Sequence, residues 1–287
     1  MQQRSIGDVK VSAIGLGALH MSSQGRPNRD RSLATIHAAL DAGITLIDTA
    51  DAYSLGGPQE EGHNEILVAE ALRSYGRDTS HVLVATKGGH TRPDQSWQVD
   101  GSPAHLKQAA EASLKRLGVG SIGLYQLHRP DPKVPFEDSV GALKDLLDEG
   151  KIQMAGVSNT DPDQIRQAQD ILGGRLVSVQ NQFSPRFQSS KVELDLCTAM
   201  GIAFLPWSPL NGAGRVERLG TTHRAFAEVG EAHGVSPQRV TLAWMLTLSP
   251  VIIPIPGASR PETITDSANA AGLTLSDDEL ARLNASV

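Results

Sequence analysis

Short apolar runs alternate with longer amphipathic segments along the chain, and this alternation restricts the possible folds more than any other feature. The apolar runs lie at residues 13–17, 44–49, 81–87, 121–128, 152–159, 176–182, 202–207 and 251–257. Segments with the helical spacing of apolar residues lie between them, for example at 31–43, 65–76, 104–118 and 137–150. Eight strand–helix units predict an α/β fold, a closed (β/α)8 TIM barrel, with an open doubly wound sheet as the alternative.

The domain organisation predicted from the sequence is simple. A barrel of this kind commonly occupies one domain of this length, and the chain has 287 residues without a break in composition. We therefore expect residues 1–287 to form a single domain. The opening stretch RSIGDVKVS contains two short strand-like runs around Gly7 and Asp8, which predicts an N-terminal β-hairpin before the first barrel strand.

Several helix ends carry clear local signals. Ser102-Pro103, Asp161-Pro162 and Ser236-Pro237 each place a capping residue before a proline, which is typical of a helix start.

The stretch 118–123 matches the glycine pattern G-x-G-x-x-G of dinucleotide-binding loops. That pattern has this meaning only between a strand and a following helix, whereas here it follows a helix and precedes a strand. We therefore interpret these glycines as a turn.

Composition excludes several classes of function. The formal net charge of −6 and the pI of about 5.8 argue against nucleic-acid binding. No apolar run approaches the ~18 residues of a membrane span, and the first residues lack the apolar core of a signal peptide. The one cysteine, Cys197, lies in an apolar helical pattern and is expected to be a buried small residue. We expect a cytoplasmic protein, monomeric by default, without a metal site, that acts on a small molecule.

Polar side chains gather where the predicted strands end. In a barrel of this type the active site lies at the carboxyl ends of the strands. The second, third and fourth runs end in Asp48, Lys87 and His128, and Tyr53 follows Asp48 by five residues in the stretch DTADAY. Any one of these residues has an ordinary structural explanation, but an acid, an amine, an imidazole and a phenol on adjacent strand ends form a set suited to proton transfer.

The expected roles follow from the chemistry of these groups. A phenol is a weak acid at neutral pH, and a nearby ammonium group lowers its pKa. Asp48 would hold Lys87 in place, and a neutral imidazole at His128 would orient a carbonyl oxygen. Asp51 is close enough in sequence to compete with Asp48, but it lies beyond the strand, so we expect it to be a loop or pocket residue.

At these residues the sequence resembles the aldo-keto reductase family. The resemblance covers essentially the whole chain and rests on the order and spacing of several segments: GLGALHM, DTADAY, ATKGG, LYQLHRPD, GKIQMAGVSN, VQNQFSP, PWSPL and IPIPGASRPE. It implies a (β/α)8 barrel that reduces aldehydes or ketones with NAD(P)H. It also implies a catalytic tetrad of Asp48, Tyr53, Lys87 and His128, in which Tyr53 protonates the carbonyl oxygen.

The resemblance also implies a cofactor site. Ser158, Asn159 and Gln180 would hold the nicotinamide carboxamide, and Trp207 would stack on the ring, with core packing as its alternative role. The complete set implied for cofactor binding is Gly17, Ala18, Leu19, Asp48, Ser158, Asn159, Gln180, Trp207, Ser208, Pro209, Leu210, Gly257, Ser259, Arg260 and Asp266.

The choice between the two cofactors depends on the segment that starts at Gly257. This segment leads into a helix starting at Pro261, so backbone N–H groups and Arg260 could bind a phosphate there. The segment keeps the acid at Asp266, but Ser267 and Thr263 depart from residues that relatives often carry. Because Arg260 can contact a 2′-phosphate through two N–H groups, we expect NADPH rather than NADH.

The substrate pocket is expected to be lined by loops that follow the strands. His20, Met21 and Trp97 are the candidates, together with the loops 54–64 and 88–102. Trp97 would form a wall or lid of the pocket, with packing on the outside of the barrel as the alternative. The sequence does not name the carbonyl substrate.

Two other functions remain open at this point. One is a regulatory subunit that senses a nicotinamide cofactor and turns over little substrate. The other is a lyase of the same fold in which Lys87 forms a Schiff base with a carbonyl substrate. The lyase hypothesis leaves the neighbouring Tyr53 and His128 without a role.

Overall fold

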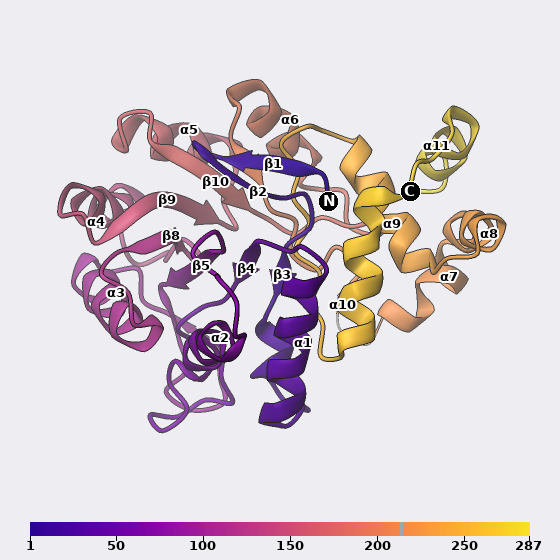
Figure 1. Cartoon of the computed structure of the whole chain (residues 1–287). Helices are drawn as coiled ribbons and strands as arrows, with labels where there is room; N and C mark the ends of the chain where they lie inside the picture. The colour runs from indigo at the N-terminus through magenta and orange to yellow at the C-terminus, as the bar shows by residue number, and fades with distance from the viewer. Residues whose placement is uncertain (213–214) are drawn as a thin grey trace.

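A curled parallel sheet of seven strands forms the centre of the molecule (Figure 1). The computed structural model describes residues 1–212 and 215–287. The strands lie in the order β11-β10-β9-β8-β5-β4-β3. Their bounds are Leu16–Gly17 (β3), Leu46–Asp48 (β4), Leu83–Gly88 (β5), Ile122–Leu127 (β8), Ile152–Ser158 (β9), Leu176–Gln180 (β10) and Ala203–Phe204 (β11).

Helices surround this sheet on its outer side (Figure 1). The first group follows the strands in turn: α1 (Arg29–Asp41), α2 (His63–Ser74), α3 (Pro103–Leu117), α4 (Phe136–Asp148), α5 (Pro162–Ile171) and α6 (Lys191–Met200). The second group comes after β11: α7 (Leu219–Thr222), α8 (Arg224–His233), α9 (Pro237–Thr247), α10 (Pro261–Ala268) and α11 (Asp277–Asn284). Single 3₁₀ turns lie at Leu19–Met21, Val216–Arg218 and Asn269–Gly272.

The predicted helix starts are confirmed by their capping bonds. Ser102 accepts a hydrogen bond from the N–H of His105 at the start of α3, and Ser236 accepts one at the start of α9. Asp161 forms a capping box with Gln164 at the start of α5. Gly118 ends α3 with a φ of 71°, and β8 begins at Ile122. Gly118 and Gly120 thus lie in the connection as predicted, whereas Gly123 is part of β8.

The segment 251–257, predicted as the eighth strand, forms no regular strand. It makes isolated parallel bridges, from Ile252 to Phe204 on one side and from Gly257 to Gly17 on the other. Its two prolines explain the difference, because Pro254 and Pro256 have no N–H to donate. Toward β3 the segment only accepts, through Pro254 O from Gly15 N at 2.9 Å and Pro256 O from Gly17 N at 3.0 Å. It therefore joins the two edges of the sheet by single bridges instead of a ladder.

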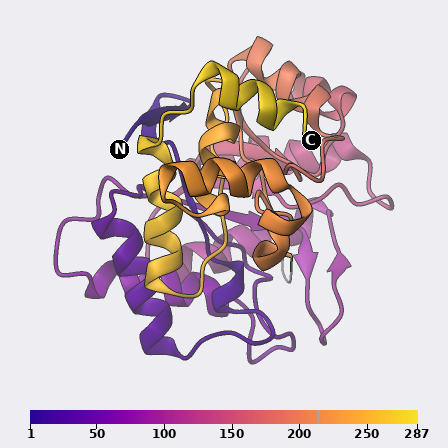
Figure 2. The same cartoon turned by 90° about the vertical axis from the view of Figure 1, so that its right-hand side faces the viewer.

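Two short hairpins lie outside the central sheet. The strands β1 (Gln3–Ile6) and β2 (Val9–Ser12) pair antiparallel, and their buried Ile6 and Val11 contact the apolar cluster formed by the starts of the sheet strands. The second hairpin, β6 (His90–Thr91) and β7 (Gln98–Val99), follows the carboxyl end of β5. Figure 2 shows it projecting on the side of the molecule opposite to the N-terminus. The two hairpins thus mark opposite ends of the sheet.

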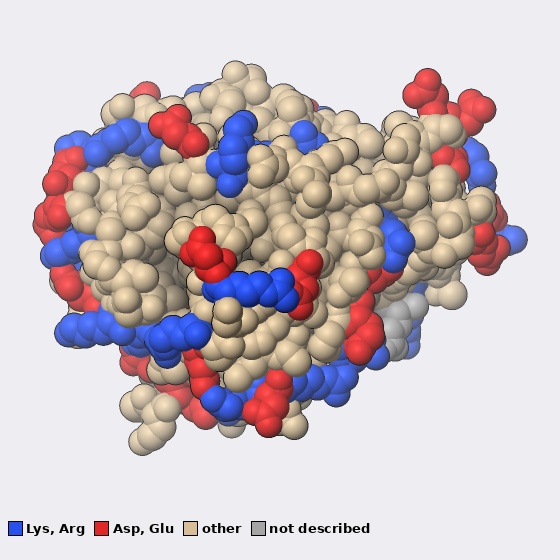
Figure 3. All heavy atoms as spheres, viewed as in Figure 1, with Lys and Arg blue, Asp and Glu red and all other residues tan. Residues whose placement is uncertain are grey.

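Apolar side chains fill both sides of the sheet. One cluster lies inside the curled sheet and includes Leu46, Leu124 and Ile253, while the largest cluster lies between the sheet and the helices. The helices of the described chain include none with both the length and the apolar character that a bilayer span requires. On the face in Figure 3, basic and acidic side chains lie side by side around the rim, instead of forming a basic stripe.

Candidate functional site

The four predicted catalytic side chains come together at the carboxyl end of the sheet. Asp48 is the last residue of β4, Lys87 lies near the end of the adjacent β5, and His128 follows directly after β8. Tyr53 lies in the loop after β4 and returns to Lys87. The parallel register places Asp48 beside Ala85 of β5, and Lys87 beside Gln126 of β8. The three side chains thus lie at the carboxyl ends of adjacent strands, which explains why residues far apart in sequence meet.

Lys87 is the centre of this cluster. Its ammonium group is fully buried and donates to Asp48 Oδ2 at 2.7 Å, to Thr49 O at 2.8 Å and to Tyr53 Oη at 3.1 Å. Burial by itself lowers the pKa of Lys87, but Asp48 and Tyr53 outweigh it, so the pKa is raised above its ordinary value. Lys87 therefore stays protonated, which disfavours the Schiff-base lyase hypothesis because imine formation needs the free amine.

The pKa of Tyr53 corrects one expectation. The ammonium group of Lys87 does lower this pKa, as predicted, but burial of the phenol raises it more, and the pKa lies above its ordinary value. Tyr53 is therefore a protonated phenol at neutral pH. Its hydroxyl is held beside a positive charge, and that charge would stabilise the phenolate formed when the proton leaves.

His128 forms the side of the cluster nearest to Tyr53. The two ring centroids lie 5.6 Å apart. Burial and the charge of Lys87 lower the pKa of His128 well below its ordinary value, so the imidazole is neutral. Its Nδ1 atom is buried and has no hydrogen-bond partner among residues 1–212 and 215–287. The imidazole thus retains hydrogen-bonding capacity for a ligand.

The cluster opens into a cavity of about 580 Å³, called the main cavity here. It is lined by Gly17, Leu19, His20, Asp48, Tyr53, His90, Trp97, His128, Arg129, Ser158, Asn159, Gln180, Trp207, Ser208, Pro209, Leu210, Gly212, Val216, Ile255, Pro256 and Gly257. Cavities of this size hold cofactors and small substrates. Lys87 lies behind Tyr53 and does not line it.

Amide and hydroxyl side chains form one wall of the main cavity. Gln180 Nε2 donates to Asp48 Oδ1 at 2.8 Å, and Ser158 Oγ donates to Gln180 O at 2.7 Å. Asn159 Nδ2 donates to His128 O at 3.0 Å. Asn159 and Ser208 both have positive φ, at 58° and 51°, which is uncommon for residues with a Cβ and clusters at functional sites. This wall is thus continuous with the cluster around Lys87.

Comparison with known proteins identifies the family of this chain. The family model described as "Aldo/keto reductase family" matches residues 13–287. The chain belongs to the aldo/keto reductase family. It is 35% identical to an uncharacterized oxidoreductase of Schizosaccharomyces pombe over 97% of this chain and 88% of that protein. It is 33% identical to the 6-dehydroglucose reductase of Novosphingobium aromaticivorans over 91% of this chain and 87% of that protein.

A solved structure extends the comparison to the fold. The aldo/keto reductase from Klebsiella pneumoniae, in complex with NADP and acetate, superposes with a TM-score of 0.81 at 28% identity, covering 96% of this chain and 91% of that one. The α/β architecture and the oxidoreductase class are therefore established for this aldo/keto reductase.

The main cavity of this aldo/keto reductase fits a nicotinamide. Trp207 presents a partly exposed indole to the cavity while also packing against the inner cluster. The side-chain amides of Asn159 and Gln180 lie on the same cavity wall, where a carboxamide could bond to them. The indole Nε1 is buried without a partner in the described chain. Flat aromatic surface together with amide donors matches the ring and the carboxamide of this group.

Several residues predicted for the site do not line the main cavity. Met21 is fully buried in the apolar cluster beside Ile36 and Leu67, so it does not line the main cavity. Asp266 accepts hydrogen bonds from Arg239 Nη2 at 2.6 Å and from Ser236, so its carboxylate joins α10 to α9. Ala18, Ser259 and Arg260 also lie outside the main cavity. Strand-end position alone cannot show which way such side chains point.

Trp97 forms part of the wall of the main cavity. Its indole lies edge-on to Tyr53 and to His128, with ring centroids 6.5 Å away in each case, and Arg92 lies over it at 4.3 Å. The side chain lines the main cavity and is 46% exposed, so the alternative of packing on the barrel exterior does not hold.

His90 is a cavity residue that the sequence reasoning missed. Its ring centroid lies 4.4 Å from that of His128 and 5.3 Å from that of Trp97. Arg129, which directly follows His128, lines the cavity as well. The loop 88–102 was singled out for the pocket, but no spacing in it distinguishes His90, because that side chain reaches the site through the β6–β7 hairpin.

Metal and thiol chemistry find no support in the described residues. Among them, no group of three or more His, Cys, Asp or Glu side chains is arranged to hold a metal ion. Cys197 is fully buried, and burial raises the pKa of its thiol to about 12. A thiol in this state is a packing residue, as the sequence predicts.

Proposed function

We propose that this protein reduces an aldehyde or ketone to the alcohol, with NADPH as hydride donor and Tyr53 as general acid. The observation that carries the proposal is the buried cluster in which Lys87 contacts both Asp48 and Tyr53 beside the neutral His128. We propose further that the whole chain acts as one domain around this site.

Each side chain of the cluster has a distinct task in the proposed reaction. Tyr53 gives its hydroxyl proton to the carbonyl oxygen, and the ammonium group of Lys87 stabilises the phenolate that remains. Asp48 keeps Lys87 charged and in position. His128, being neutral, can donate one N–H to the substrate oxygen without competing for the proton. Bound NADPH would supply the hydride to the carbonyl carbon.

Ser158, Asn159, Gln180 and Trp207 would hold the nicotinamide end of the cofactor. The NADP bound to the Klebsiella pneumoniae relative supports a cofactor of this class. Gly257 forms part of the same wall, and a Cβ there would come within 2.3 Å of the His20 ring. A side chain at that position would therefore have to displace the His20 ring.

Exchange of the proton donor tests the proposal directly. Tyr53→Phe keeps the aromatic ring and removes the acid, so kcat should fall by roughly 10²–10⁴ while the Kd for NADPH changes little. The measurement is NADPH oxidation with 4-nitrobenzaldehyde, together with cofactor titration by tryptophan fluorescence. Tyr75→Phe is the matched control, because Tyr75 makes its hydroxyl bond to Asp41 on the surface.

The two outcomes of this experiment separate the candidate functions. Wild-type kcat in Tyr53→Phe would rule out this proton donor. Tight NADPH binding by the wild-type protein without turnover of any carbonyl would instead favour the regulatory hypothesis.

The choice of NADPH rests on Arg260. This residue is exposed directly before α10, while Asp266 in α10 is engaged by Arg239. We expect Arg260→Ala to weaken NADPH binding about tenfold or more and NADH binding much less, since a hydrogen bond to a charged group contributes about 1.5–3 kcal/mol. Arg224→Ala, which changes an exposed arginine at the start of α8, is the control. Equal losses for both cofactors would contradict the assignment.

A further inference from the structure

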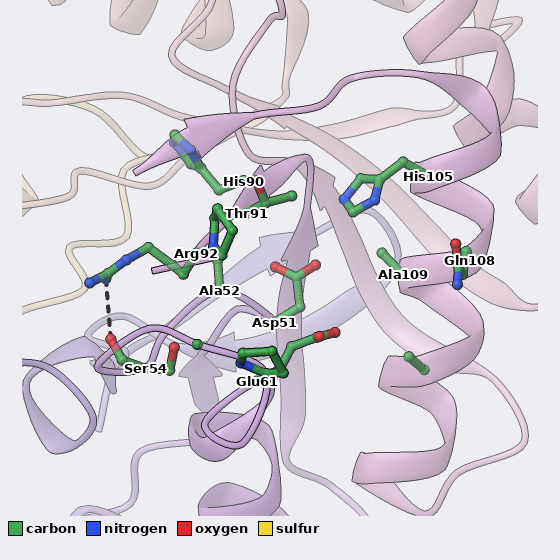
Figure 4. Close-up of a pocket in the computed structure, with 14 residues that line it drawn as sticks. Asp51, Ala52, Ser54, Glu61, His90, Thr91, Arg92, His105, Gln108 and Ala109 are labelled. Carbon is green, nitrogen blue, oxygen red and sulfur yellow. Dashed lines mark hydrogen bonds between the residues drawn. The ribbon is translucent and has the colours of Figure 1, made fainter. Parts of the chain in front are cut away.

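A second cavity lies beside the main cavity, on the other side of the loop that carries Tyr53. Its volume is about 340 Å³, and it is called the side cavity here. The loop after β4, the β6 segment and α3 enclose it (Figure 4). His90 lines both cavities, and Asp51 and Ala52, just before Tyr53, line only the side cavity. Nothing in the proposed reduction uses this space.

Asp51 presents a buried carboxylate to the side cavity. The residue is only 5% exposed, and its Oδ1 atom has no hydrogen-bond partner in the part of the chain that the structure describes. Its backbone is fixed on both sides, because its N–H donates to Lys87 O at 3.3 Å and its carbonyl accepts from Gly62 N at 3.0 Å. The side chain is therefore held toward the cavity instead of turning to solvent.

The charges around Asp51 are already committed elsewhere. Arg116 is the nearby cation, but it donates to Glu61 at 2.7 Å and to Glu65 at 2.8 Å. Burial is the main cause that raises the pKa of Asp51 well above its ordinary value, and the charge of Glu65 adds to it. Arg116 lowers this pKa only in part. The carboxylate therefore lacks a cation of its own.

The other basic side chain of the cavity wall faces away from Asp51. Arg92 donates to the backbone carbonyls of Ser54 at 3.1 Å and Leu55 at 3.3 Å. Figure 4 shows its guanidinium group directed to Ser54, away from the Asp51 carboxylate. His105, which reaches the cavity from α3, has a buried Nε2 atom that lacks a partner in residues 1–212 and 215–287. Apart from Arg92 Nε, the buried side-chain atoms of this wall that lack a partner in the described residues are Asp51 Oδ1 and His105 Nε2.

Much of the remaining wall of the side cavity is apolar, although Ser54, Glu61, Thr91 and Gln108 also line it. Ala52, Pro58, Pro93, Ala109 and Ala112 surround the acid. A water molecule takes up about 30 Å³ of liquid, so the cavity has room for a ligand of roughly ten non-hydrogen atoms. A metal ion is a poor match, because the described residues contain no group of three or more His, Cys, Asp or Glu side chains arranged to hold one.

We propose that the side cavity is a binding site for a small primary alkylammonium ion. The ammonium group would donate hydrogen bonds to Asp51 Oδ1 and to His105 Nε2, and the alkyl chain would lie against Ala109 and Pro93. This arrangement supplies the buried acid with its missing counter-charge and leaves apolar surface facing the apolar wall.

The proposal has a proton-linked signature. Because burial raises the pKa of Asp51 in the ligand-free protein, this carboxyl keeps its proton to a higher pH than an exposed aspartate does. A bound cation favours the ionised form, so binding should release protons, up to one for each ligand. An adventitious cation on a surface carboxylate would release none.

Calorimetric titration of the intact protein with n-butylammonium and with n-butanol tests the proposal. The titrations are run at about pH 6.5 in phosphate and in MES, whose protonation enthalpies differ, so that proton release can be measured. We expect n-butylammonium to bind at least tenfold more tightly than n-butanol and to release protons. Asp51→Asn should weaken n-butylammonium binding at least tenfold and reduce the proton release. Asp41→Asn, at an exposed carboxylate, should change neither.

Three results would overturn the proposal: equal affinities for the amine and the alcohol, binding unchanged in Asp51→Asn, or no binding of n-butylammonium to the wild-type protein. Circular dichroism establishes that the variant is folded. If it is not, the comparison of amine with alcohol and the proton release of the wild-type protein decide the question. Because no reductase assay is involved, this test is independent of the proposed catalytic function.

Discussion

Two aspartates three positions apart, in the same stretch of chain, have opposite environments. Asp48 and Asp51 are almost equally buried, at 3% and 5% exposure. Asp48 accepts from Lys87 at 2.7 Å and from Gln180 at 2.8 Å, whereas Asp51 Oδ1 finds no partner in the described chain. Burial alone therefore does not determine the state of a carboxyl group. The neighbouring charge does, and only one of the two has a cation to itself.

The backbone explains why the two differ. Asp48 is the last residue of β4, so the sheet sets the direction of its side chain. The carboxylate faces Lys87 of the neighbouring strand β5 and Gln180 of β10. Asp51 lies beyond the strand, where the loop has turned outward toward α3. The same residue type is thus part of a proton-transfer cluster in one position and of a separate cavity in the other.

The largest expected effect is loss of the Asp48 charge. Asp48→Asn leaves the buried Lys87 ammonium without its counter-ion, which should lower the free energy of unfolding by about 3–5 kcal/mol. Urea unfolding at neutral pH measures it. The double variant Asp48→Asn with Lys87→Met removes both charges and should recover most of the stability, but not the turnover. A loss below about 1 kcal/mol in the single variant would show that the pair is not the stabilising unit.

Loss of the Asp51 charge should act in the opposite direction. Since the pKa of Asp51 is raised in the folded protein, mainly by burial, its ionisation resists folding. In the unfolded chain the pKa of an aspartate is about 3.9. Below that pH, Asp51 is protonated in both the folded and the unfolded state, so its ionisation does not change the free energy of unfolding. As pH rises from there to the folded pKa, the wild-type protein should lose stability relative to Asp51→Asn.

This relative loss should amount to about 1.4 kcal/mol for each unit by which the pKa is raised. Urea unfolding of both proteins from about pH 4 to pH 8 measures the difference. A gap that stays constant over this range would contradict the raised pKa of Asp51.

The smallest expected effect concerns Glu61, which is 65% exposed in its side chain and pairs with Arg116. After burial and Glu65, its charge is a further cause of the raised pKa of Asp51. Glu61→Gln should therefore lower that pKa slightly, and the stability should change by less than about 0.5 kcal/mol. A carbon-13 NMR titration of the Asp51 carboxyl measures the shift. The variant also releases Arg116 from Glu61, so that Arg116 should attract the Asp51 carboxylate more strongly and lower its pKa further. An upward shift would contradict this expectation.

Sequence pattern predicted the parts of this molecule that depend on strand order. The alternation of strands and helices places Asp48, Lys87 and His128 at adjacent strand ends, and the structure brings these three side chains together with Tyr53. The expected regular eighth strand is wrong for a local reason, the two prolines of the segment 251–257. That reason is itself readable in the sequence, because a proline cannot donate to a ladder.

Other features depend on contacts that no local pattern encodes. Met21 is turned into the core, and Asp266 is bound by Arg239, a residue from another helix. His90 reaches the main cavity only because the β6–β7 hairpin folds over the strand ends. The side cavity likewise exists between a loop and a helix that are separate in sequence. Strand ends can be located by periodicity, whereas the paths of the loops that cover them cannot.

The bridge between Gly17 and Gly257 has a consequence for how the protein is made. Both glycines line the main cavity, and the segment around Gly257 joins β11 to β3 only by single bridges. During synthesis on a ribosome, the ladder from β3 to β11 can assemble before residues 251–257 emerge, but the wall of the main cavity cannot. A nicotinamide cofactor can therefore stabilise only a nearly complete chain, and the cavity is the last part of the sheet to be sealed.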